Sequence, residues 1–264
     1  MEMINLYRHC EDTHYKLLCG MYFDKEEKVH GATVVYSNNL SDLLWNYGTR
    51  VNLAAKIDEV IESVSRILTL RGRTPAFYLP SYNEIPDLLQ SLVDTGFQAQ
   101  FRDAWMFWDK NPPEAVDSKF RFSFVENPKD MDQFAGIYDD AYRGGDGPYA
   151  FPPEYTKAVR SSYKSHVAGV LARNYLAHDR DGEVVGILSL ISKGRLYGVY
   201  NVATIPSKQG RGIGSSLILK SVHDAFKMGA KAIFLQTEPD STNEAFYRNR
   251  GFSTKFLATC YSKS

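Results

Sequence analysis

The segment Ile205-Pro-Ser-Lys-Gln-Gly-Arg-Gly-Ile-Gly-Ser215 contains the residues with the clearest chemical use. It lies between an expected strand and an expected helix, and its glycines remove side chains where the first amides of a helix have no partner. The N–H groups from Gly210 to Ser215 would face a bound oxyanion, supported by the helix dipole and by Lys208 or Arg211. The pattern predicts a pyrophosphate site that works without a metal, although the glycines would also suit a simple tight turn.

Two better-known phosphate loops do not fit this segment. No Gly-Lys-Ser/Thr triplet occupies the place that a Walker loop requires. Gly210, Gly212 and Gly214 are spaced as G-x-G-x-G, whereas the dinucleotide fingerprint is G-x-G-x-x-G. A protein that binds a different nucleotide through this loop is therefore the weaker alternative, and competition between coenzyme A and ATP would separate the two.

The loop resembles the Q/R-x-x-G-x-G/A motif of the GNAT superfamily of acyl-CoA N-acyltransferases, matched by Gln209, Gly212 and Gly214. In element order the resemblance runs from about Phe120 to Ser264. It implies acetyl-CoA as the acyl donor, with the pantetheine arm on the backbone of the strand before the loop. The cofactor-binding residues that it implies are Val202, Ala203, Thr204, Gln209, Gly210, Arg211, Gly212, Ile213, Gly214, Ser215 and Asn243.

A second segment, Ala245-Phe-Tyr-Arg-Asn-Arg-Gly-Phe252, is similar to the family's A-x-x-LY-x-x-x-GF stretch and implies that Tyr247 protonates the departing thiolate. A phenol with an ordinary pKa of about 10 can donate to such a leaving group. Tyr247 would also suit a hydrophobic core. The family's Asn seven residues before the tyrosine is replaced here by Asp240. Either Asp240 or Asn243 would serve equally as a helix cap.

The implied reaction is direct attack of a primary amine on the thioester, with backbone amides near Val202–Thr204 polarising the carbonyl. Glu238, just past an expected strand, is the first candidate for the base, and His178 and Tyr200 are weaker ones. The acceptor, a small molecule or a peptide, should meet the loop from Tyr142 to Phe151. In that loop Asp146 would attract a cation, and Tyr149 and Phe151 would pack on its apolar part; a plain surface loop is the alternative.

Around these segments the sequence predicts an α+β fold with a GNAT-like mixed, mostly antiparallel sheet flanked by helices, used twice. Adjacent prolines at 112 and 113 mark a boundary between residues 1–113 and residues 119–264. The helices are expected at 51–70, 130–142, 212–228 and 242–249, and the strands at 76–79, 120–125, 174–178, 183–191, 196–204, 232–237 and 254–261. Gly96-Phe97 with Phe101 repeats as Gly251-Phe252 with Phe256, which favours one fold used twice.

The first half lacks the catalytic residues: Leu92 stands four residues before Gly96, where Tyr247 stands in the second half, and no Gln-x-x-Gly-x-Gly precedes the helix expected at Val51. We interpret residues 1–113 as a degenerate GNAT-like domain. It would support the active half, cover the acceptor site or form the contact of a homodimer. A chain that only binds or senses acyl-CoA is the alternative to an enzyme, and the presence of Tyr247 favours chemistry.

Composition restricts the partners and the compartment. Lys plus Arg and Asp plus Glu both total 31, so the net charge is zero and nothing attracts nucleic acid or an anionic membrane. Cys10, Cys19 and Cys260 have no metal-ligand spacing and indicate reduced thiols in a cytoplasmic protein, with a Cys10–Cys19 disulfide as the minor alternative. The sequence predicts no signal peptide and no membrane span.

Overall fold

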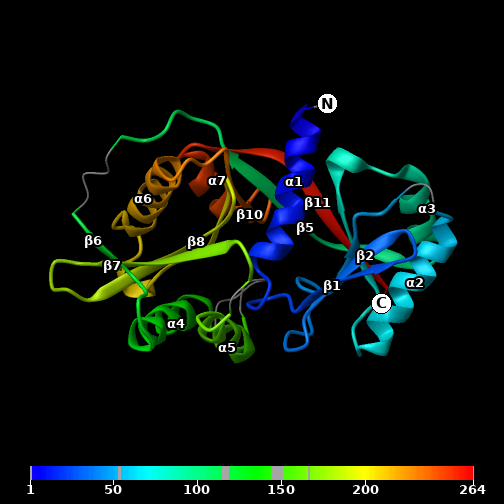
Figure 1. The fold of residues 1–264 in the computed structure, drawn as a ribbon, viewed down its shortest axis with the longest axis horizontal. Coiled ribbons are helices and arrows are strands. Elements are labelled where there is room, and N and C mark those ends of the chain that lie inside the picture. Colours follow the sequence, from blue (N-terminus) through cyan, green and yellow to red (C-terminus); the bar gives the residue numbers. More distant parts are fainter. Residues whose placement is uncertain (1, 53–54, 115–118, 144–150, 166, 264) are drawn as a thin grey trace. The chain divides into compact units, whose positions relative to one another are not determined.

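The computed structural model describes residues 2–52, 55–114, 119–143, 151–165 and 167–263. They form two compact units (Figure 1). Unit 1 comprises Met1–Met106, Gln236–Ala245 and Thr254–Ser264, and unit 2 comprises Phe107–Leu235 and Phe246–Ser253. The single domain predicted for residues 119–264 divides between the two units, because 236–245 and 254–264 group with unit 1.

Unit 1 is a sheet with the strand order β1-β2-β3-β4-β11-β5 and three helices. The strands are β1 (Lys25–Val29), β2 (Ala32–Tyr36), β3 (Tyr47–Thr49), β4 (Ala76–Pro80), β5 (Phe97–Trp108) and β11 (Phe252–Lys263). The helices are α1 (Glu2–Leu17), α2 (Ile57–Leu70) and α3 (Pro86–Asp94), with a 3-10 turn η1 (Ser81–Asn83). All neighbouring pairs with a known register are antiparallel except β3 and β4, which pair in parallel.

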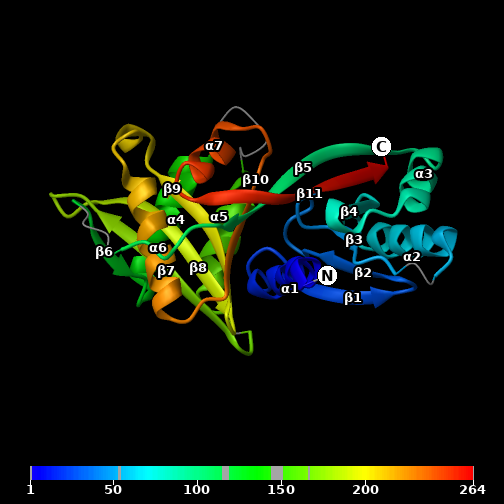
Figure 2. The same ribbon diagram turned by 90° about the horizontal axis from the view of Figure 1, so that it is seen from above.

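The core of unit 1 lies between the sheet and the helices α2 and α3, which lie side by side (Figure 2). Apolar residues of α2 recur at helical spacing and bury one face: Val60, Ile61, Val64 and Leu68. Helix α1 packs on the same unit through Tyr7, whose ring centroid lies 5.2 Å from that of Phe256. Phe256 belongs to β11, so the last strand of the chain is part of the core around its first helix.

Unit 2 is a sheet with the strand order β10-β9-β8-β7-β6. The strands are β6 (Arg121–Phe124), β7 (Val170–His178), β8 (Val184–Lys193), β9 (Leu196–Thr204) and β10 (Ala232–Thr237). The helices are α4 (Pro128–Tyr142), α5 (Pro153–Ser162) and α6 (Ile213–Lys227), with a 3-10 turn η2 (Pro206–Lys208). Helix α7 (Thr242–Arg248) belongs to unit 2 only from Phe246 onward. Helix α6 covers one face of the sheet, and α4 and α5 cover the other (Figure 1).

Local signals explain the connections of unit 2. Strands β7 and β8 form the expected hairpin, closed by a bond from Gly182 N–H to the Asp179 carbonyl, with Gly182 at φ 86°. Helix α6 ends at Lys227, and Gly229, the residue after its C-cap Met228, has φ 84°, as a helix-terminating glycine should. The expected α+β fold with a mixed sheet is therefore confirmed.

The expected elements agree with the structure in most places, and three differences stand out. The helix expected from Val51 begins at Ile57, after Lys56 in extended backbone, so its predicted start is wrong. Helices α1, α3 and α5 and strands β1–β3 and β5 were not predicted. The last strand, expected as part of the second domain, pairs antiparallel with β4 of unit 1, from Ala258 opposite Pro80 to Ser262 opposite Ala76.

The element order repeats along the chain. The series β3-α2-β4-α3-β5 has the same order as β9-α6-β10-α7-β11, and the first two strands of each series pair in parallel. Gly96 and Gly251 occupy the same helix-to-strand junction, and both have positive φ, 89° and 121°. The Gly-Phe repeat in the sequence therefore marks equivalent places in two similar series of elements.

Two general expectations can be compared with the structure. Cys10, Cys19 and Cys260 are free thiols, as the sequence analysis expected, and the alternative Cys10–Cys19 disulfide is not formed. Within the described ranges, every helix is too short or too polar to be a candidate for crossing a membrane.

Candidate active site

The loop between β9 and α6 lies in unit 2 and ends in a helix start that no side chain caps. Gly212, the residue before the helix, has φ 87° and ψ 5°, a left-handed conformation that costs glycine little. The first turn of α6 contains no acidic residue. The first amides of a helix have no partner within it, so the N–H groups of Ile213, Gly214 and Ser215 carry the positive end of the dipole. This helix start is suited to an anion.

Strands β9 and β10 separate just before the loop. They pair in parallel only where Leu196–Gly198 of β9 lies opposite Ala232–Phe234 of β10. Beyond this, Asn201 adopts φ 52°, and the pairing of β9 with β8 shifts register between Ile187 and Ser189. Backbone past the paired region is therefore open to other partners on the β10 side, which is where Val202–Thr204 was expected to hold a ligand.

Two of the expected backbone groups are already in use. Gln209 Nε2 donates to the Thr204 carbonyl oxygen at 3.4 Å. The Tyr142 hydroxyl donates to the Val202 carbonyl oxygen at 2.9 Å, and burial raises the pKa of that phenol to about 12. This bond ties the end of α4 to the end of β9. The N–H groups of this stretch, more than the Val202 carbonyl, are therefore suited to receive a ligand or a developing oxyanion.

Cations gather beside the loop. A pocket of about 270 Å³ is lined by Lys119, Phe120, Asp179, Arg180, Asp181, Lys208, Arg211 and Ile213. Lys208 Nζ lies 2.8 Å from Asp179 Oδ2, and this hydrogen bond is the main cause that lowers the pKa of the Asp179 carboxyl. Arg211 is exposed and, among the described residues, has neither ion-pair nor hydrogen-bond partner. Of the two cations suggested by the sequence, Arg211 is thus the one available to an anion.

Arg250, which the sequence analysis did not single out, fastens α7 to the start of α6. Its Nε and Nη2 donate to Ser215 Oγ at 3.0 and 2.7 Å, and its Nη1 donates to the Phe246 carbonyl at 2.7 Å. Its guanidinium carbon lies 3.6 Å from the centroid of the Phe246 ring. The only sequence signal was its place inside the segment 245–252 that carries Tyr247.

Gly214 also serves this contact. A Cβ at Gly214 would lie 3.2 Å from Cζ of Phe246, so a larger residue would push the ring away. The glycine motif therefore has two physical uses: Gly212 supplies a left-handed turn, and Gly214 lets α7 approach α6 closely. Ser215, expected only as a phosphate donor, holds Arg250 with its hydroxyl oxygen.

Tyr247 is half-buried and packs edge-on against two neighbours. Its ring centroid lies 5.2 Å from that of Phe246 and 6.1 Å from that of Phe252. Phe246 contacts Gly214 in the first turn of α6, and Tyr247 is the next residue in the chain. The backbone of Tyr247 therefore lies close to the start of α6. These ring contacts fit both uses considered for Tyr247, the proton donor and the packed aromatic, so its catalytic role stays a prediction.

Glu238 and Asn243 belong to unit 1, and their roles also stay predictions. Ser241 caps α7: its Oγ accepts from Glu244 N–H at 3.1 Å, and Glu244 Oε2 accepts from Asp240 N–H at 2.7 Å. The suggestion that Asp240 or Asn243 caps this helix is therefore wrong. The sequence contained the signal, because Ser241 and Glu244 have the spacing of a capping box.

The two weaker base candidates have structural contacts. His178 Nδ1 lies 3.1 Å from the Gly182 carbonyl, which can only accept, so this nitrogen carries the proton. Nε2 then accepts from Ser123 Oγ at 2.7 Å. The Tyr200 ring covers Gly198, where a Cβ would come within 2.4 Å of it. These contacts do not decide whether either side chain acts as a base, so both roles stay predictions.

The expected acceptor loop is described only at its ends. Asp146 and Tyr149 lie outside the described residues. Tyr142 and Phe151, its two ends, are joined by a bond from Phe151 N–H to the Tyr142 carbonyl at 3.1 Å, with ring centroids 5.4 Å apart. No group of three or more His, Cys, Asp or Glu side chains that would hold a metal occurs among the described residues.

The sequence of this region matches one protein family. Residues 132–252 match the family model described as Acetyltransferase (GNAT) family. This part of the chain is therefore similar to a GNAT domain. The match includes both motifs, the glycine loop and the segment of Tyr247, and most of unit 2. No curated protein matches the sequence.

Solved structures extend the likeness in fold to nearly the whole chain. A GCN5-related N-acetyltransferase from Kribbella flavida matches with a TM-score of 0.67 and 16% identity, over 96% of this chain and 95% of that one. A functionally unknown conserved protein from Staphylococcus epidermidis matches with 0.66 and 14%, over 92% and 94%. A tandem GNAT protein from the clavulanic acid biosynthesis pathway matches with 0.62 and 12%, over 87% and 77%. At such identities these likenesses concern the fold.

Proposed function

We propose that this protein is an N-acetyltransferase that moves the acetyl group of acetyl-CoA to a primary amine by direct attack. The observation that carries the proposal is the uncapped start of α6 at Gly212, placed just after β9 leaves β10. An anion-binding helix start beside open strand backbone suits a ligand with a pyrophosphate at one end and an amide-containing arm at the other.

Binding would use both parts of this arrangement. The amides of the first turn of α6 and the guanidinium of Arg211 would hold the pyrophosphate by charge-assisted hydrogen bonds. The backbone of Val202–Thr204 would bond the pantetheine arm, which points the thioester along β9. Arg250 keeps Ser215, in the first turn, at a fixed distance from α7, so the cofactor loop and Tyr247 would keep their mutual geometry during binding.

In the chemical step the amine nitrogen forms a bond to the thioester carbonyl carbon and the carbon–sulfur bond breaks. Backbone N–H groups near Val202–Thr204 would stabilise the negative charge that develops on the carbonyl oxygen. Tyr247 would give its proton to the departing thiolate. The proton lost by the ammonium would pass to a base, for which Glu238 is the candidate, or to water.

The acceptor is proposed to be an amine with an apolar part, on a small molecule or a peptide. Four aromatic rings of unit 2 gather beside the end of β9, where Tyr142 bonds the Val202 carbonyl. They are those of Tyr138, Tyr142, Phe151 and Tyr155, and the last two stack at 4.2 Å between centroids. Tyr138 and Tyr155 are buried, so the partly exposed rings of Tyr142 and Phe151 would meet the apolar group and the cation of the acceptor.

Calorimetry with acetyl-CoA and coenzyme A tests the cofactor assignment. Arg211→Glu reverses the exposed charge at the loop and should weaken both ligands at least about tenfold, the worth of one charge-assisted hydrogen bond. Lys231→Glu makes the same charge change at an exposed position just before β10 and should leave both affinities unchanged. Equal effects of the two variants, or no binding by the unaltered chain, would rule out this site.

Tyr247→Phe tests the chemistry separately. It should lower kcat for acetylation of an amine acceptor about a hundredfold, the usual contribution of a positioned acid, and leave the affinity for acetyl-CoA unchanged. An unchanged kcat would remove Tyr247 from the mechanism. Tight acetyl-CoA binding without acetylation of any amine would instead indicate a protein that binds or senses the thioester.

A further inference from the structure

A second pocket, of about 390 Å³, lies within unit 1 where β3 and β4 separate. These strands pair only at Gly48 and Phe77. The pocket is lined by the residues that follow, among them Arg50 and Leu79, and by Glu11 and Asp12 of α1 and Tyr82 of η1. In the repeated order of elements, β3 and β4 correspond to β9 and β10. The pocket therefore occupies in unit 1 the place that the cofactor backbone site occupies in unit 2.

This pocket is unsuited to a polyanion such as coenzyme A. The first turn of α2 carries Asp58 and Glu59, whereas the first turn of α6 carries no acid. No glycine precedes α2 at the place of Gly212, because Lys56 is the residue before that helix. The lining of the pocket carries as many acidic as basic side chains, so the pocket offers no net positive charge to an anion. A ligand of this pocket must have another chemistry.

Glu11 is the unusual group of the pocket. It is 2% exposed, and its carboxylate accepts only from hydroxyl groups: Oε1 from Thr49 at 2.9 Å and Tyr15 at 3.2 Å, and Oε2 from Tyr82. Among the described residues, no Lys, Arg or His nitrogen lies within ion-pair distance of it. Oε2 accepts one donor and has capacity for a second. Glu11 is thus a buried acid with pre-set hydrogen bonds and no cation.

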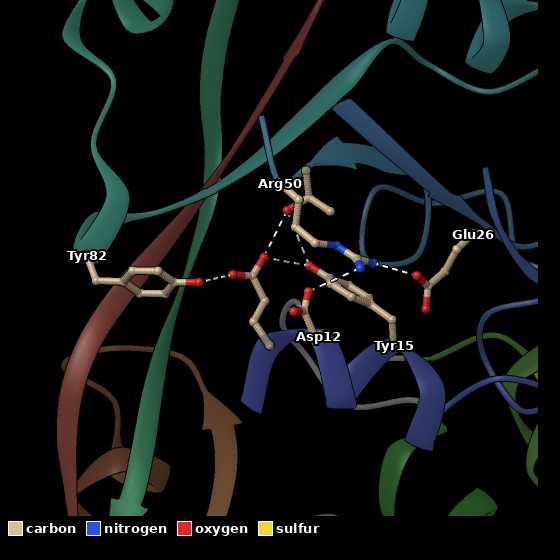
Figure 3. Close-up of polar contacts among 7 residues, drawn as sticks. Asp12, Tyr15, Glu26, Arg50 and Tyr82 are labelled. Atoms are coloured by element: carbon tan, nitrogen blue, oxygen red, sulfur yellow. Dashed lines mark hydrogen bonds and ion pairs between the residues drawn. The ribbon is translucent and has the colours of Figure 1, made fainter. Parts of the chain in front are cut away.

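Arg50, the nearest candidate partner, is committed elsewhere. Its Nη1 lies 3.1 Å from Asp12 Oδ1 and its Nη2 lies 2.8 Å from Glu26 Oε2, and its guanidinium sits over the Tyr15 ring at 4.8 Å (Figure 3). Arg50 also has φ 53°, a conformation that side-chain-bearing residues adopt at some cost. Both terminal nitrogens of Arg50 therefore bind other carboxylates, its buried Nε has no hydrogen-bond partner among the described residues, and Glu11 forms no ion pair with it.

We propose that this pocket binds a small ammonium ligand, whose cationic head pairs with Glu11 and whose apolar part packs on Leu79, Ile85 and Tyr82. A buried carboxylate without a cation gains more from an incoming ammonium than a solvated one, because its desolvation has already occurred. Three hydroxyl donors hold the carboxylate in place before binding, which lowers the ordering cost. The Tyr82 ring offers a face for the same cation. The volume is within the range of small-molecule sites.

Binding should depend on pH in a defined direction. Burial has the largest effect on the Glu11 carboxyl and raises its pKa. The hydroxyl donors and the charge of Arg50 lower that pKa, but by less. The charged and titratable groups that surround it are Arg8, Asp12 and Tyr15 of α1, Arg50 after β3 and Tyr82 of η1. An ammonium favours the ionised acid, so binding releases a proton from the protonated fraction. Affinity should therefore fall as the pH is lowered through the pKa of Glu11.

Calorimetry on the full chain with 2-phenylethylamine as the probe tests the proposal. Glu11→Gln keeps the shape of the side chain and removes its charge, and it should weaken the amine at least about tenfold. Glu62→Gln, an exposed position on α2, should change nothing. The uncharged analogue 2-phenylethanol should not bind. Amine binding that is equal in the native chain and Glu11→Gln, or absent from the native chain, overturns the proposal.

A second variant keeps the test decisive if Glu11→Gln fails to fold. Tyr82→Phe removes one donor to the carboxylate, which should raise the pKa of Glu11 further and move the loss of amine binding to higher pH. An unchanged pH profile overturns the proposal. Binding at the proposed acceptor site of unit 2 would respond to neither substitution, so the result is independent of the acetyltransferase assignment. Acetyl-CoA affinity should be the same in all three variants.

Discussion

Gly212→Ala is the substitution whose effect can be worked out most directly from the structure. A Cβ at this position would meet no atom within 4 Å, so the only obstacle is the backbone, held at φ 87°. A left-handed conformation costs an L-residue about 1–2 kcal/mol, and the smaller backbone freedom of alanine in the unfolded chain returns about 0.4–1 kcal/mol. The difference between the centres of these two ranges is an expected net loss of about 0.8 kcal/mol in the free energy of unfolding.

The same substitution should affect the cofactor. If the chain relieves the strain by leaving the left-handed region, the first amides of α6 turn away from the anion, and the loss of one charge-assisted bond weakens acetyl-CoA about tenfold. Gly212→Asn should recover part of both effects, because asparagine tolerates this conformation better. Urea denaturation and calorimetry with acetyl-CoA measure the two quantities on the same samples.

Gly229 provides the matched control. It has φ 84°, nothing would lie within 4 Å of its Cβ, and it ends the same helix that Gly212 begins. Gly229→Ala should therefore cost a similar free energy of unfolding and leave acetyl-CoA binding intact. The reasoning is refuted if Gly212→Ala is as stable as the parent chain, or if both variants weaken acetyl-CoA to the same extent.

Three further outcomes are expected. Arg250→Met should lower the free energy of unfolding by about 1–2 kcal/mol in urea denaturation and weaken acetyl-CoA, because the half-buried guanidinium loses its bonds to Ser215 and Phe246; unchanged stability would contradict this. Gly186→Ala places a Cβ 2.5 Å from Ile213 Cγ2 and should cost about 1–3 kcal/mol in the same assay, more than Gly229→Ala. Burial raises the pKa of Asp103 to about 6, above its unfolded value, so its contribution to stability is complete below about pH 4 and lost as the pH rises to about 6. Asp103→Asn should abolish this decrease in the free energy of unfolding between about pH 4 and pH 6, while the amide oxygen still accepts a hydrogen bond from the Tyr78 hydroxyl. An unchanged pH dependence of the free energy of unfolding would contradict the raised pKa of Asp103.

The elements around the glycine loop could be predicted because their signals are local. β9, the loop, α6 and the Gly229 cap follow from alternation, helical spacing and glycine positions within about thirty residues. Helix α1 was missed for an equally physical reason. It buries Glu11, His14 and Thr13 alongside its apolar residues, so its inward face does not stand out as hydrophobic.

The partners of the site could not be predicted, because they depend on contacts between distant segments. Nothing in the local sequence indicates that Arg250 reaches Ser215, or that Tyr142 occupies the Val202 carbonyl. The boundary after residue 113 separates the repeated series of elements. It does not separate the compact units, because strand pairing places the end of the chain beside β4.

The pairing of β11 with β4 has a consequence for biosynthesis. Tyr78 lies opposite Cys260, so unit 1 depends on hydrogen bonds between residues about 180 positions apart. During synthesis on the ribosome, β4 emerges early, and the edge that pairs with β11 stays unpaired until β11 has been synthesised. Such delayed long-range closure is slow and exposes an edge to wrong partners. A fragment that ends at residue 113 would lack β11 altogether, so unit 1 is not expected to fold from the N-terminal half alone.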